Sequence, residues 1–234
     1  MSTAVVFAGG PHHLDGSSRD VAPSGSGAVG LLAPHALGPL LMVADLVVAV
    51  DSGLHLARAF DLNVDLVIGD MDSVDPAVLE QAAASGAEVS RFPADKDFTD
   101  LELALDEVAS RGVTAVTVIG SGEGRLDHLL GGLLTLAAPR FSTMRIDAWL
   151  GSAYVCVVHD ERRIVGAPGA LLSILPVNGT ASGVRTSGLR WPLRGEQLAP
   201  GSSRGVSNEF LDEVAHVSVD EGCVVVVVPQ EEQP

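Results

Sequence analysis

The chain has 234 residues, of which 47% are hydrophobic, and its 14 basic and 30 acidic side chains give a formal net charge of −16. This length and apolar content allow a sizeable folded core. The shortage of Lys and Arg argues against a broad nucleic-acid-binding surface, and we expect no nucleic-acid partner. Both cysteines, Cys156 and Cys223, lie in apolar runs and are interpreted as small buried side chains.

We expect no membrane partner and a cytoplasmic location. No apolar run approaches the ~20 residues that span a bilayer. Residues 1–10 also lack the basic start of a signal peptide.

Short apolar runs and amphipathic segments alternate through the first part of the chain. An apolar run at residues 4–8 ends in Gly9 and Gly10 and predicts a buried strand. Residues 11–35, rich in Gly, Ser, Pro and His, predict a long loop. Strand-like runs then occupy residues 46–50, 65–70, 87–92 and 115–120, and helix-like segments follow them at 54–61, 76–85, 100–112 and 125–137. This alternation predicts a parallel sheet covered by helices on both faces.

Helix-capping residues mark the ends of two of these segments. Thr99 and Glu102 have the spacing of a capping box, and Gly112 is a suitable stop for the same helix. Asp75 before Pro76 is typical of a helix start.

The pattern changes near residue 146, where helical periodicity gives way to short apolar runs. These runs cover residues 145–150, 153–158, 170–177, 213–219 and 223–229. The sequence therefore predicts an α/β fold with two domains. Residues 1–146 would form a three-layer domain with a parallel sheet, and residues 147–234 a smaller, sandwich-like antiparallel β domain.

Carboxylates accumulate where the apolar runs end. Asp51 follows one run, Asp70 and Asp72 follow the next, and the segment DKDFTD holds Lys96, Asp97 and Asp100. Ligands bind beyond the carboxyl ends of strands in an open parallel sheet, so these side chains are expected to lie together. Two carboxylates at 4 Å repel by about 4 kcal/mol at an effective dielectric of 20, and a bound cation would offset this repulsion. All-oxygen ligands favour Mg²⁺ or Mn²⁺, although each Asp alone could equally be a turn or capping residue.

The segment GSGEGRLDH, residues 120–128, follows the last strand-like run of this region. Gly122 and its neighbouring glycines let a loop approach an anion, and Arg125 can form a fork with phosphate oxygens. Asp127 could orient Arg125 or His128, or simply be an acid in the first helical turn. The glycine spacing matches neither a Walker A loop nor a dinucleotide fingerprint.

Taken together, the segments DSGLHLARAFDLNVDLVIGDMDSVDP, DKDFTDLELAL and GSGEGRLDHLLG, with TSGLRWPL and GVSNEF further on, resemble the thiamine pyrophosphokinase (thiamine diphosphokinase) family. The resemblance runs from about Leu46 to Val228. Two positions depart from the family pattern: Ser52 stands where Gly is common, and Glu123 where a second consecutive Gly is usual.

This resemblance implies transfer of a pyrophosphoryl group from ATP to thiamine, giving thiamine diphosphate and AMP, with Mg²⁺ as cofactor and ATP as co-substrate. It implies a catalytic set and a nucleotide-binding set in the α/β domain. The catalytic set is Asp70, Asp72, Lys96, Asp97, Asp100 and Arg125, with Asp70, Asp72 and Asp100 as metal ligands. The ATP-binding set is Asp51, Gly122, Arg125, Asp127 and His128.

For thiamine, the resemblance implies a site in the β domain with help from a neighbouring subunit, and hence a homodimer. Trp191, Ser207 and Asn208 are the candidates. The aromatic face of Trp191 suits a cationic thiazolium, although a core or interface tryptophan would explain it as well.

Two other functions remain open. LVIGDMDSV fits the D-x-D pattern of phosphatases, in which Asp70 would form an aspartyl-phosphate. That motif, however, usually follows the first strand of its domain, and DKDFTD would go unexplained. A non-catalytic sensor of nucleotide or thiamine is the second alternative, which Ser52 and Glu123 favour.

Overall fold

The computed structural model describes residues 2–10, 43–122 and 124–229. The loop predicted at residues 11–35 and the departure from the family pattern at Glu123 lie outside these ranges. The chain divides into two compact units, one of residues 1–132 with 148–152, the other of residues 133–147 with 153–234. The domain boundary expected after residue 146 falls inside strand β6 (Arg145–Leu150), which contributes residues to both units.

The first unit is built on a parallel sheet with the strand order β5-β1-β2-β3-β4. Its elements are β1 (Thr3–Phe7), β2 (Leu46–Val50), α2 (Gly53–Ala59), β3 (Leu66–Gly69), α3 (Pro76–Ala84), β4 (Glu88–Arg91), α4 (Asp100–Ser110), β5 (Ala115–Gly120) and the first part of α5 (Leu126–Leu136). All four predicted strand–helix pairs are present, which confirms the parallel α/β prediction.

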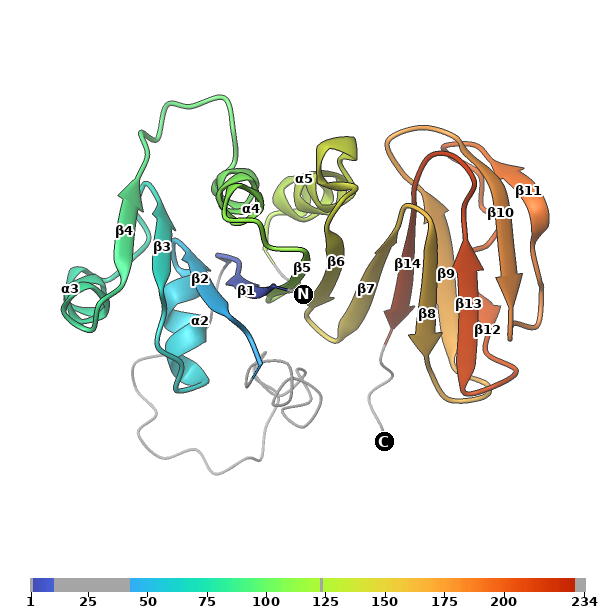
Figure 1. Cartoon of the computed structure of the whole chain (residues 1–234), viewed down its shortest axis with the longest axis horizontal. Helices are drawn as coiled ribbons and strands as arrows, with labels where there is room; N and C mark the ends of the chain where they lie inside the picture. The colour runs from blue at the N-terminus through green and yellow to red at the C-terminus, as the bar shows by residue number, and fades with distance from the viewer. Residues whose placement is uncertain (1, 11–42, 123, 230–234) are drawn as a thin grey trace. The chain divides into compact units, whose positions relative to one another are not determined.

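Both faces of this sheet are covered, and its strands are largely apolar apart from the edge strand β4, whose sequence is EVSR. On one face, Phe7 and Ala49 pack with Leu54 of α2 in one buried cluster. Helix α4 contacts β2 and β3 and lies on the opposite side of the sheet from α2 (Figure 1). Each fully buried aliphatic or aromatic side chain contributes about 1.5–3 kcal/mol, so the sheet is a rigid support for the loops at its edge.

The predicted capping residues are confirmed. Thr99 is the N-cap of α4, and its hydroxyl accepts the Glu102 N–H at 3.2 Å. Asp75 caps α3 by accepting the Ala77 N–H at 2.8 Å. Helix α4 ends before Gly112, whose φ of +76° is the left-handed conformation that a helix stop requires.

The second unit is a sandwich of antiparallel strands, as predicted. One layer has the order β12-β9-β14-β7 and the other β11-β10-β13-β8. The strands are β7 (Ala153–Val158), β8 (Glu161–Val165), β9 (Leu171–Pro176), β10 (Ala181–Ser187), β11 (Arg194–Leu198), β12 (Asn208–Glu209), β13 (Val214–Ser218) and β14 (Val224–Pro229), and a short 3-10 helix, η2 (Pro139–Phe141), precedes β6. The valine run of β14 pairs with strands on both sides, which explains its unbroken apolar character.

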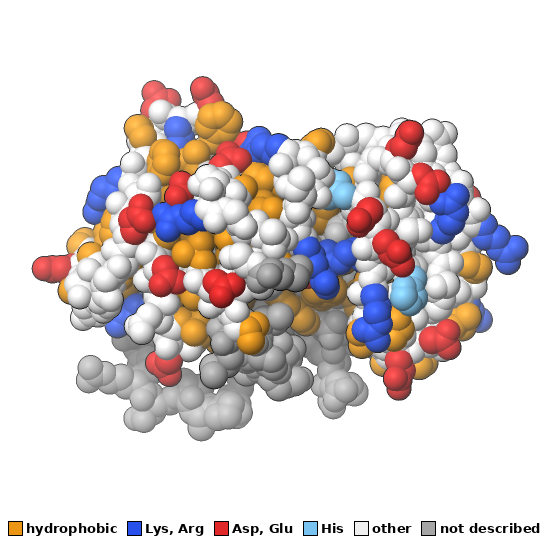
Figure 2. Space-filling view, in the orientation of Figure 1, with side chains coloured by type: hydrophobic (Ala, Val, Ile, Leu, Met, Phe, Trp, Pro, Cys, Tyr) orange, Lys and Arg blue, Asp and Glu red, His pale blue; other side chains and the backbone are white. Residues whose placement is uncertain are grey.

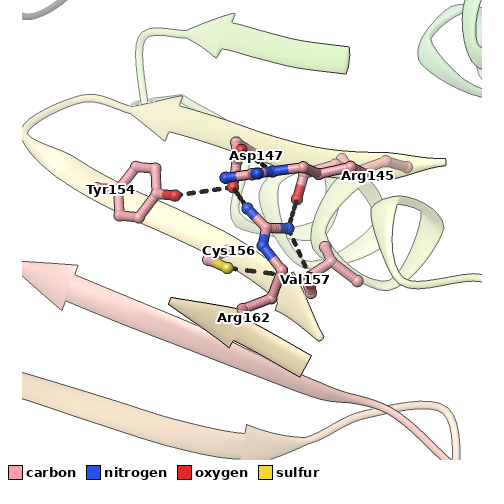
Figure 3. Close-up of polar contacts among 7 residues, drawn as sticks. Arg145, Asp147, Tyr154, Cys156, Val157 and Arg162 are labelled. Carbon is pink, nitrogen blue, oxygen red and sulfur yellow. Dashed lines mark hydrogen bonds and ion pairs between the residues drawn. The ribbon is translucent and has the colours of Figure 1, made fainter. Parts of the chain in front are cut away.

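A buried ion pair ties β8 to its neighbours in this unit (Figure 3). The Arg162 guanidinium donates to the Asp147 carboxylate and to the Val157 carbonyl, the latter at 3.0 Å. The Tyr154 hydroxyl donates to the same carboxylate at 2.8 Å, and burial raises the pKa of that hydroxyl above its ordinary value. Only 7% of Arg162 is exposed, so the pair is a structural cross-link between strands.

Cys156 and Cys223 are both buried and free, as predicted. Burial raises the pKa of the Cys156 thiol to about 12 and that of Cys223 to about 11. Both thiols therefore stay protonated near neutral pH and behave as apolar core atoms. Within the described part of the chain, no helix is both long and apolar enough to cross a membrane.

Candidate active site

Asp51 follows β2 directly and adopts a left-handed backbone with φ +44°. Its Oδ1 accepts the backbone N–H of Met71 at 3.1 Å, which connects the end of β2 to the loop after β3. A Cβ at Gly69 would stand 1.9 Å from that same Oδ1, and Gly69 has φ +145°. The last residue of β3 must therefore be glycine, because the Asp51 carboxylate occupies the place of its side chain.

Asp70 and Asp72 lie on a tightly held loop after β3. Asp70 Oδ1 accepts the Asp72 N–H at 3.1 Å, and Met71 between them is buried with φ +65°. At the far end of the loop, the Asp75 N–H donates to His55 Nε2 at 3.4 Å. Asp70 is partly buried while Asp72 is exposed. The loop is thus anchored to both β2 and α2.

Asp100 begins α4, and Lys96 lies one turn before it. The Lys96 ammonium lies 2.9 Å from Asp100 Oδ1 and donates to the Pro93 carbonyl at 3.0 Å. The ion pair lies outside hydrogen-bond geometry, so Asp100 Oδ1 is a buried carboxylate oxygen without a hydrogen-bond partner among the described residues. Asp97, on the same loop, is exposed.

Asp51, Asp70 and Asp100 share one electrostatic environment. The pKa of Asp51 is raised from 3.8 to about 6, first because burial disfavours the ionised form and then because Asp100 and Asp70 lie nearby, against the opposing effect of the Met71 N–H. The Asp51 carboxyl therefore resists ionisation. The proximity of these three acids confirms that the ends of β2 and β3 and the start of α4 converge.

These residues suit a cation that only one or two protein side chains coordinate directly. Among residues 2–10, 43–122 and 124–229, no three His, Cys, Asp or Glu side chains enclose a metal position. Mg²⁺ commonly uses one or two carboxylates and completes its shell with water and phosphate oxygens. Asp100 Oδ1 fits such a role, because it is a buried negative atom that has the Lys96 ammonium 2.9 Å away but no hydrogen bond of regular geometry among the described residues.

Arg125 and Asp127 form a two-point ion pair just before and within the first turn of α5. The Arg125 guanidinium donates to the two Asp127 oxygens at 3.2 and 2.6 Å, and Asp127 Oδ1 also accepts the His128 N–H at 3.0 Å. The bond from Arg125 lowers the pKa of Asp127 to about 2. The ion pair fits an Asp127 that orients Arg125, and Asp127 is also an acid in the first turn of α5, so both roles considered for it fit the structure. Both side chains are exposed, so the fork remains accessible.

Gly122 occupies a position that no other residue can fill. It has φ +66°, and a Cβ there would lie 2.6 Å from the Gly151 backbone nitrogen. The loop after β5 therefore packs directly against the turn that follows β6.

The second unit contains a pocket of about 170 Å³. Its lining residues are Trp191, Leu193, Ser203, Arg204, Gly205, Val206 and Asn208. Trp191 is 51% exposed, which rules out a core tryptophan within this chain. The Arg190 guanidinium lies over the Trp191 ring, 5.2 Å from the ring centre.

Asn208 is buried and holds the backbone of Trp191. Its Oδ1 accepts the Trp191 N–H at 3.1 Å, and its Nδ2 donates to the Trp191 carbonyl at 2.8 Å. Asn208 therefore orients the aromatic wall of the pocket. Ser207 lies next to the pocket without lining it, with φ +55° and its N–H bound to Ser173 Oγ at 3.1 Å.

Sequence reasoning missed Gly69, His55 and Arg204. Gly69 had a signal in the G-D-x-D-S pattern, where a glycine precedes two acids and marks a close approach. No sequence signal marked His55 or Arg204. The contact of His55 depends on how α2 packs against the loop after β3, and the place of Arg204 depends on which segments form the walls of the pocket.

This parallel sheet has carboxylates and a lysine at its carboxyl edge and an arginine in the loop after β5. The arrangement is typical of the class of α/β proteins that bind phosphorylated small molecules. Comparison with known families is more specific. Residues 37–148 match "Thiamin pyrophosphokinase, catalytic domain" and residues 158–224 match "Thiamin pyrophosphokinase, vitamin B1 binding domain". Together the matches cover more than half of the chain, and the chain belongs to the thiamine pyrophosphokinase family.

Similar proteins agree with this assignment. Thiamine pyrophosphokinase 1 of rice is 28% identical over 170 residues, which cover 67% of this chain and 62% of the relative. Thiamine pyrophosphokinase of Bacillus subtilis is 22% identical over 190 residues, covering 77% of this chain and 82% of the relative. The chain thus spans less than two thirds of the rice relative.

Solved structures show the same fold. The crystal structure of Bacillus subtilis thiamine pyrophosphokinase has a TM-score of 0.77 at 21% identity and covers 99% of this chain and 100% of its own. Thiamin pyrophosphokinase from Candida albicans has a TM-score of 0.73 at 13% identity, with 98% and 89% covered. These matches confirm the predicted combination of an α/β unit with a β unit.

Proposed function

We propose that this chain transfers a pyrophosphoryl group from ATP to thiamine, giving thiamine diphosphate and AMP. The observation that carries the proposal is the group of Asp51, Asp70 and Asp100 beside Lys96, in which one carboxylate oxygen is buried without a hydrogen bond. Family membership supplies the substrates. The aspartyl-phosphate and sensor alternatives have less support, because Asp70 follows the third strand of its sheet and the acidic group is intact.

In this mechanism the hydroxyl oxygen of thiamine attacks the β-phosphorus of ATP. The bond from that phosphorus to the oxygen bridging the α- and β-phosphates breaks, and AMP leaves with that oxygen. Asp70 and Asp100 would hold Mg²⁺. Asp51 would lie next to these two ligands, and Asp72 would remain exposed on the same loop as Asp70. When bound, the ion neutralises charge on the phosphates.

The cationic side chains have separate tasks. Lys96 lies beside Asp100 and would meet the transferred phosphates, while the exposed Arg125 fork would reach the leaving group. Asp127 is a poor general base because its pKa is about 2 and both its oxygens accept from Arg125. Asp97, which is exposed on the Lys96 loop, is the better candidate to accept the hydroxyl proton.

For thiamine we propose the pocket of the second unit. The exposed Trp191 ring would stack on the thiazolium ring, and Asn208 would keep Trp191 in position. The carboxylates Glu209 and Glu196 pair with Arg190 and Arg204, which limits repulsion of a cationic ligand. A homodimer in the cytoplasm completes the proposal, because the family resemblance implies that a neighbouring subunit contributes to the thiamine site; light scattering on purified protein tests the dimer.

The direct test incubates purified protein with thiamine, ATP and Mg²⁺ and measures AMP and thiamine diphosphate. We expect equal amounts of both products. Asp100→Asn should lower turnover by roughly a hundredfold or more, whereas Asp106→Asn, on an exposed position of the same helix, should retain it. Release of phosphate from phosphomonoesters without ATP would instead support the phosphatase, and binding without turnover the sensor.

A further inference from the structure

Lys96 is the only lysine in the 234-residue chain, and all other side chains that are cationic at neutral pH are arginines. It lies beside the acidic group, where the protein is proposed to meet phosphates. Arginine keeps its charge under ordinary conditions, whereas the lysine amine can lose a proton and form an amide. The chain therefore carries a single side-chain amine, and chemistry that needs such an amine is confined to this position.

Two contacts hold this amine in place. Lys96 Nζ lies 2.9 Å from Asp100 Oδ1 and donates to the Pro93 carbonyl at 3.0 Å. Asp100 Oδ1 is buried without a regular hydrogen bond among the described residues, so it can accept a proton from the ammonium. Only 12% of the Lys96 side chain is exposed, which disfavours reaction by random collision with a reagent in solution. Selective reaction at Lys96 therefore needs a reagent that the site itself binds.

We propose that Lys96 is a modification site that takes the acyl group of an acyl phosphate, and that the resulting amide switches off phosphate binding. An acyl phosphate carries a reactive carbonyl carbon on one oxygen of a phosphoryl group. Binding of that phosphoryl group beside Lys96 brings the carbon close to the amine, and holding two reactants together raises the rate of reaction between them. Because phosphates are taken as ligands of this site, the modification rests on the proposed function.

The covalent step is an acyl transfer from oxygen to nitrogen. The Lys96 ammonium gives one proton to the Asp100 carboxylate, which passes it to water, and the free amine attacks the carbonyl carbon. The bond from that carbon to the phosphate oxygen breaks, and phosphate leaves with the electron pair and takes the second proton from the nitrogen. The product is a neutral amide with one N–H, so the positive charge beside the acidic group is lost. The remaining carboxylates then repel a phosphate.

The first test treats the protein with acetyl phosphate and locates acetyl groups by mass spectrometry of its peptides. Arg163→Lys supplies a reference amine, because residue 163 is an exposed position of β8. In this variant we expect Lys96 to be acetylated at least about tenfold faster than the introduced amine or the α-amino group. Pyrophosphate with Mg²⁺ should slow acetylation of Lys96 alone. Faster reaction at the introduced amine, or no protection of Lys96 by pyrophosphate, would overturn the proposal.

The second test measures the consequence by calorimetry. Acetylated wild type should bind pyrophosphate with Mg²⁺ at least about tenfold more weakly than untreated wild type, which corresponds to about 1.4 kcal/mol. Lys96→Arg is the control, because it lacks the amine and its pyrophosphate binding should be the same before and after treatment. Acetylation of Lys96 without weaker binding, or equal weakening in treated Lys96→Arg, would contradict the proposed switch. Neither test needs thiamine or turnover, so a protein that makes no thiamine diphosphate still gives a decisive result.

Discussion

Asp51→Asn is expected to stabilise the protein above about pH 6 while it removes activity. Asparagine keeps the shape of the side chain, can still accept the Met71 N–H, and tolerates the left-handed backbone at φ +44°. It cannot ionise. The variant therefore isolates the free-energy cost of a negative charge at this position.

The size and sign of the effect follow from the raised pKa. An Asp51 pKa of about 6 in the folded chain, against 3.8 ordinarily, corresponds to about 3 kcal/mol at about 1.4 kcal/mol per pH unit. Solvent screening of a half-buried carboxyl reduces this to ~1–2 kcal/mol. The folded state holds the proton of Asp51 more tightly than the unfolded state does. The stability of wild type that depends on this proton is therefore fully present below about pH 3.8 and is lost as pH rises through about 6.

The assay is thermal unfolding of wild type and variant in EDTA between pH 4 and 7.5. The difference in free energy of unfolding should be near zero at pH 4 and favour Asp51→Asn by ~1–2 kcal/mol at pH 7, or roughly 2–8 °C in the unfolding midpoint. Asp61→Asn is a matched control, since Asp61 also has a left-handed backbone, with φ +55°, but is exposed. A difference independent of pH, or a less stable variant at pH 7, would refute the reasoning.

Three further predictions concern the metal, the close approach at Gly69 and the buried arginine. Mg²⁺ with pyrophosphate should raise the unfolding midpoint of wild type at pH 7 more than that of Asp51→Asn; equal shifts would remove Asp51 from the cation site. Gly69→Ala should lower the free energy of unfolding by roughly 2–4 kcal/mol and remove most activity. Gly86→Ala, with φ +104° but open space around its Cβ, should lose less stability and keep activity. Equal losses of stability in the two variants would mean that backbone strain alone is the cause. Arg162→Ala should lower the free energy of unfolding by about 1.5–3 kcal/mol, because Asp147 keeps the Tyr154 hydroxyl and Arg145 but loses its charge-assisted bond to Arg162. A loss below ~0.5 kcal/mol in urea unfolding would contradict this.

Much of the fold could be predicted because the relevant signals are local. The valine-rich runs, the capping residues Thr99 and Asp75, and the stop at Gly112 act within a few residues of the chain, and all were confirmed. Strands β8, β10, β11 and β12 were not predicted. Their burial alternates or is mostly exposed, as in the Arg194–Leu198 strand, so their place in the sandwich depends on distant partners.

The candidate site was predictable in composition but less so in arrangement. Carboxylates at strand ends indicated which loops would meet, yet sequence could not show that Asp51 would be the acid with the raised pKa. The raised pKa depends on the burial of the Asp51 carboxylate, which packs against Gly69. It also depends on Asp100, which belongs to a helix about fifty residues further along the chain. The surface charge alone would not have located the site, because acidic side chains are spread over the face shown in Figure 2.

The acidic group is better explained by ligand binding than by folding. Asp51 and Met71 both hold left-handed backbones, a Cβ is excluded at Gly69, and a buried Asp100 oxygen lacks a hydrogen bond. The buried carboxylate of Asp51 adds a further cost, which its raised pKa reflects, and asparagine at residue 51 would remove that cost without changing the shape of the loop. A cation with phosphate oxygens would offset all the carboxylate repulsion at once, since it neutralises the charges that disfavour ionisation. The same residues that weaken the free protein thus become the strongest contacts of its complex, which is why the pH dependence of stability and the binding of pyrophosphate should change together in Asp51→Asn.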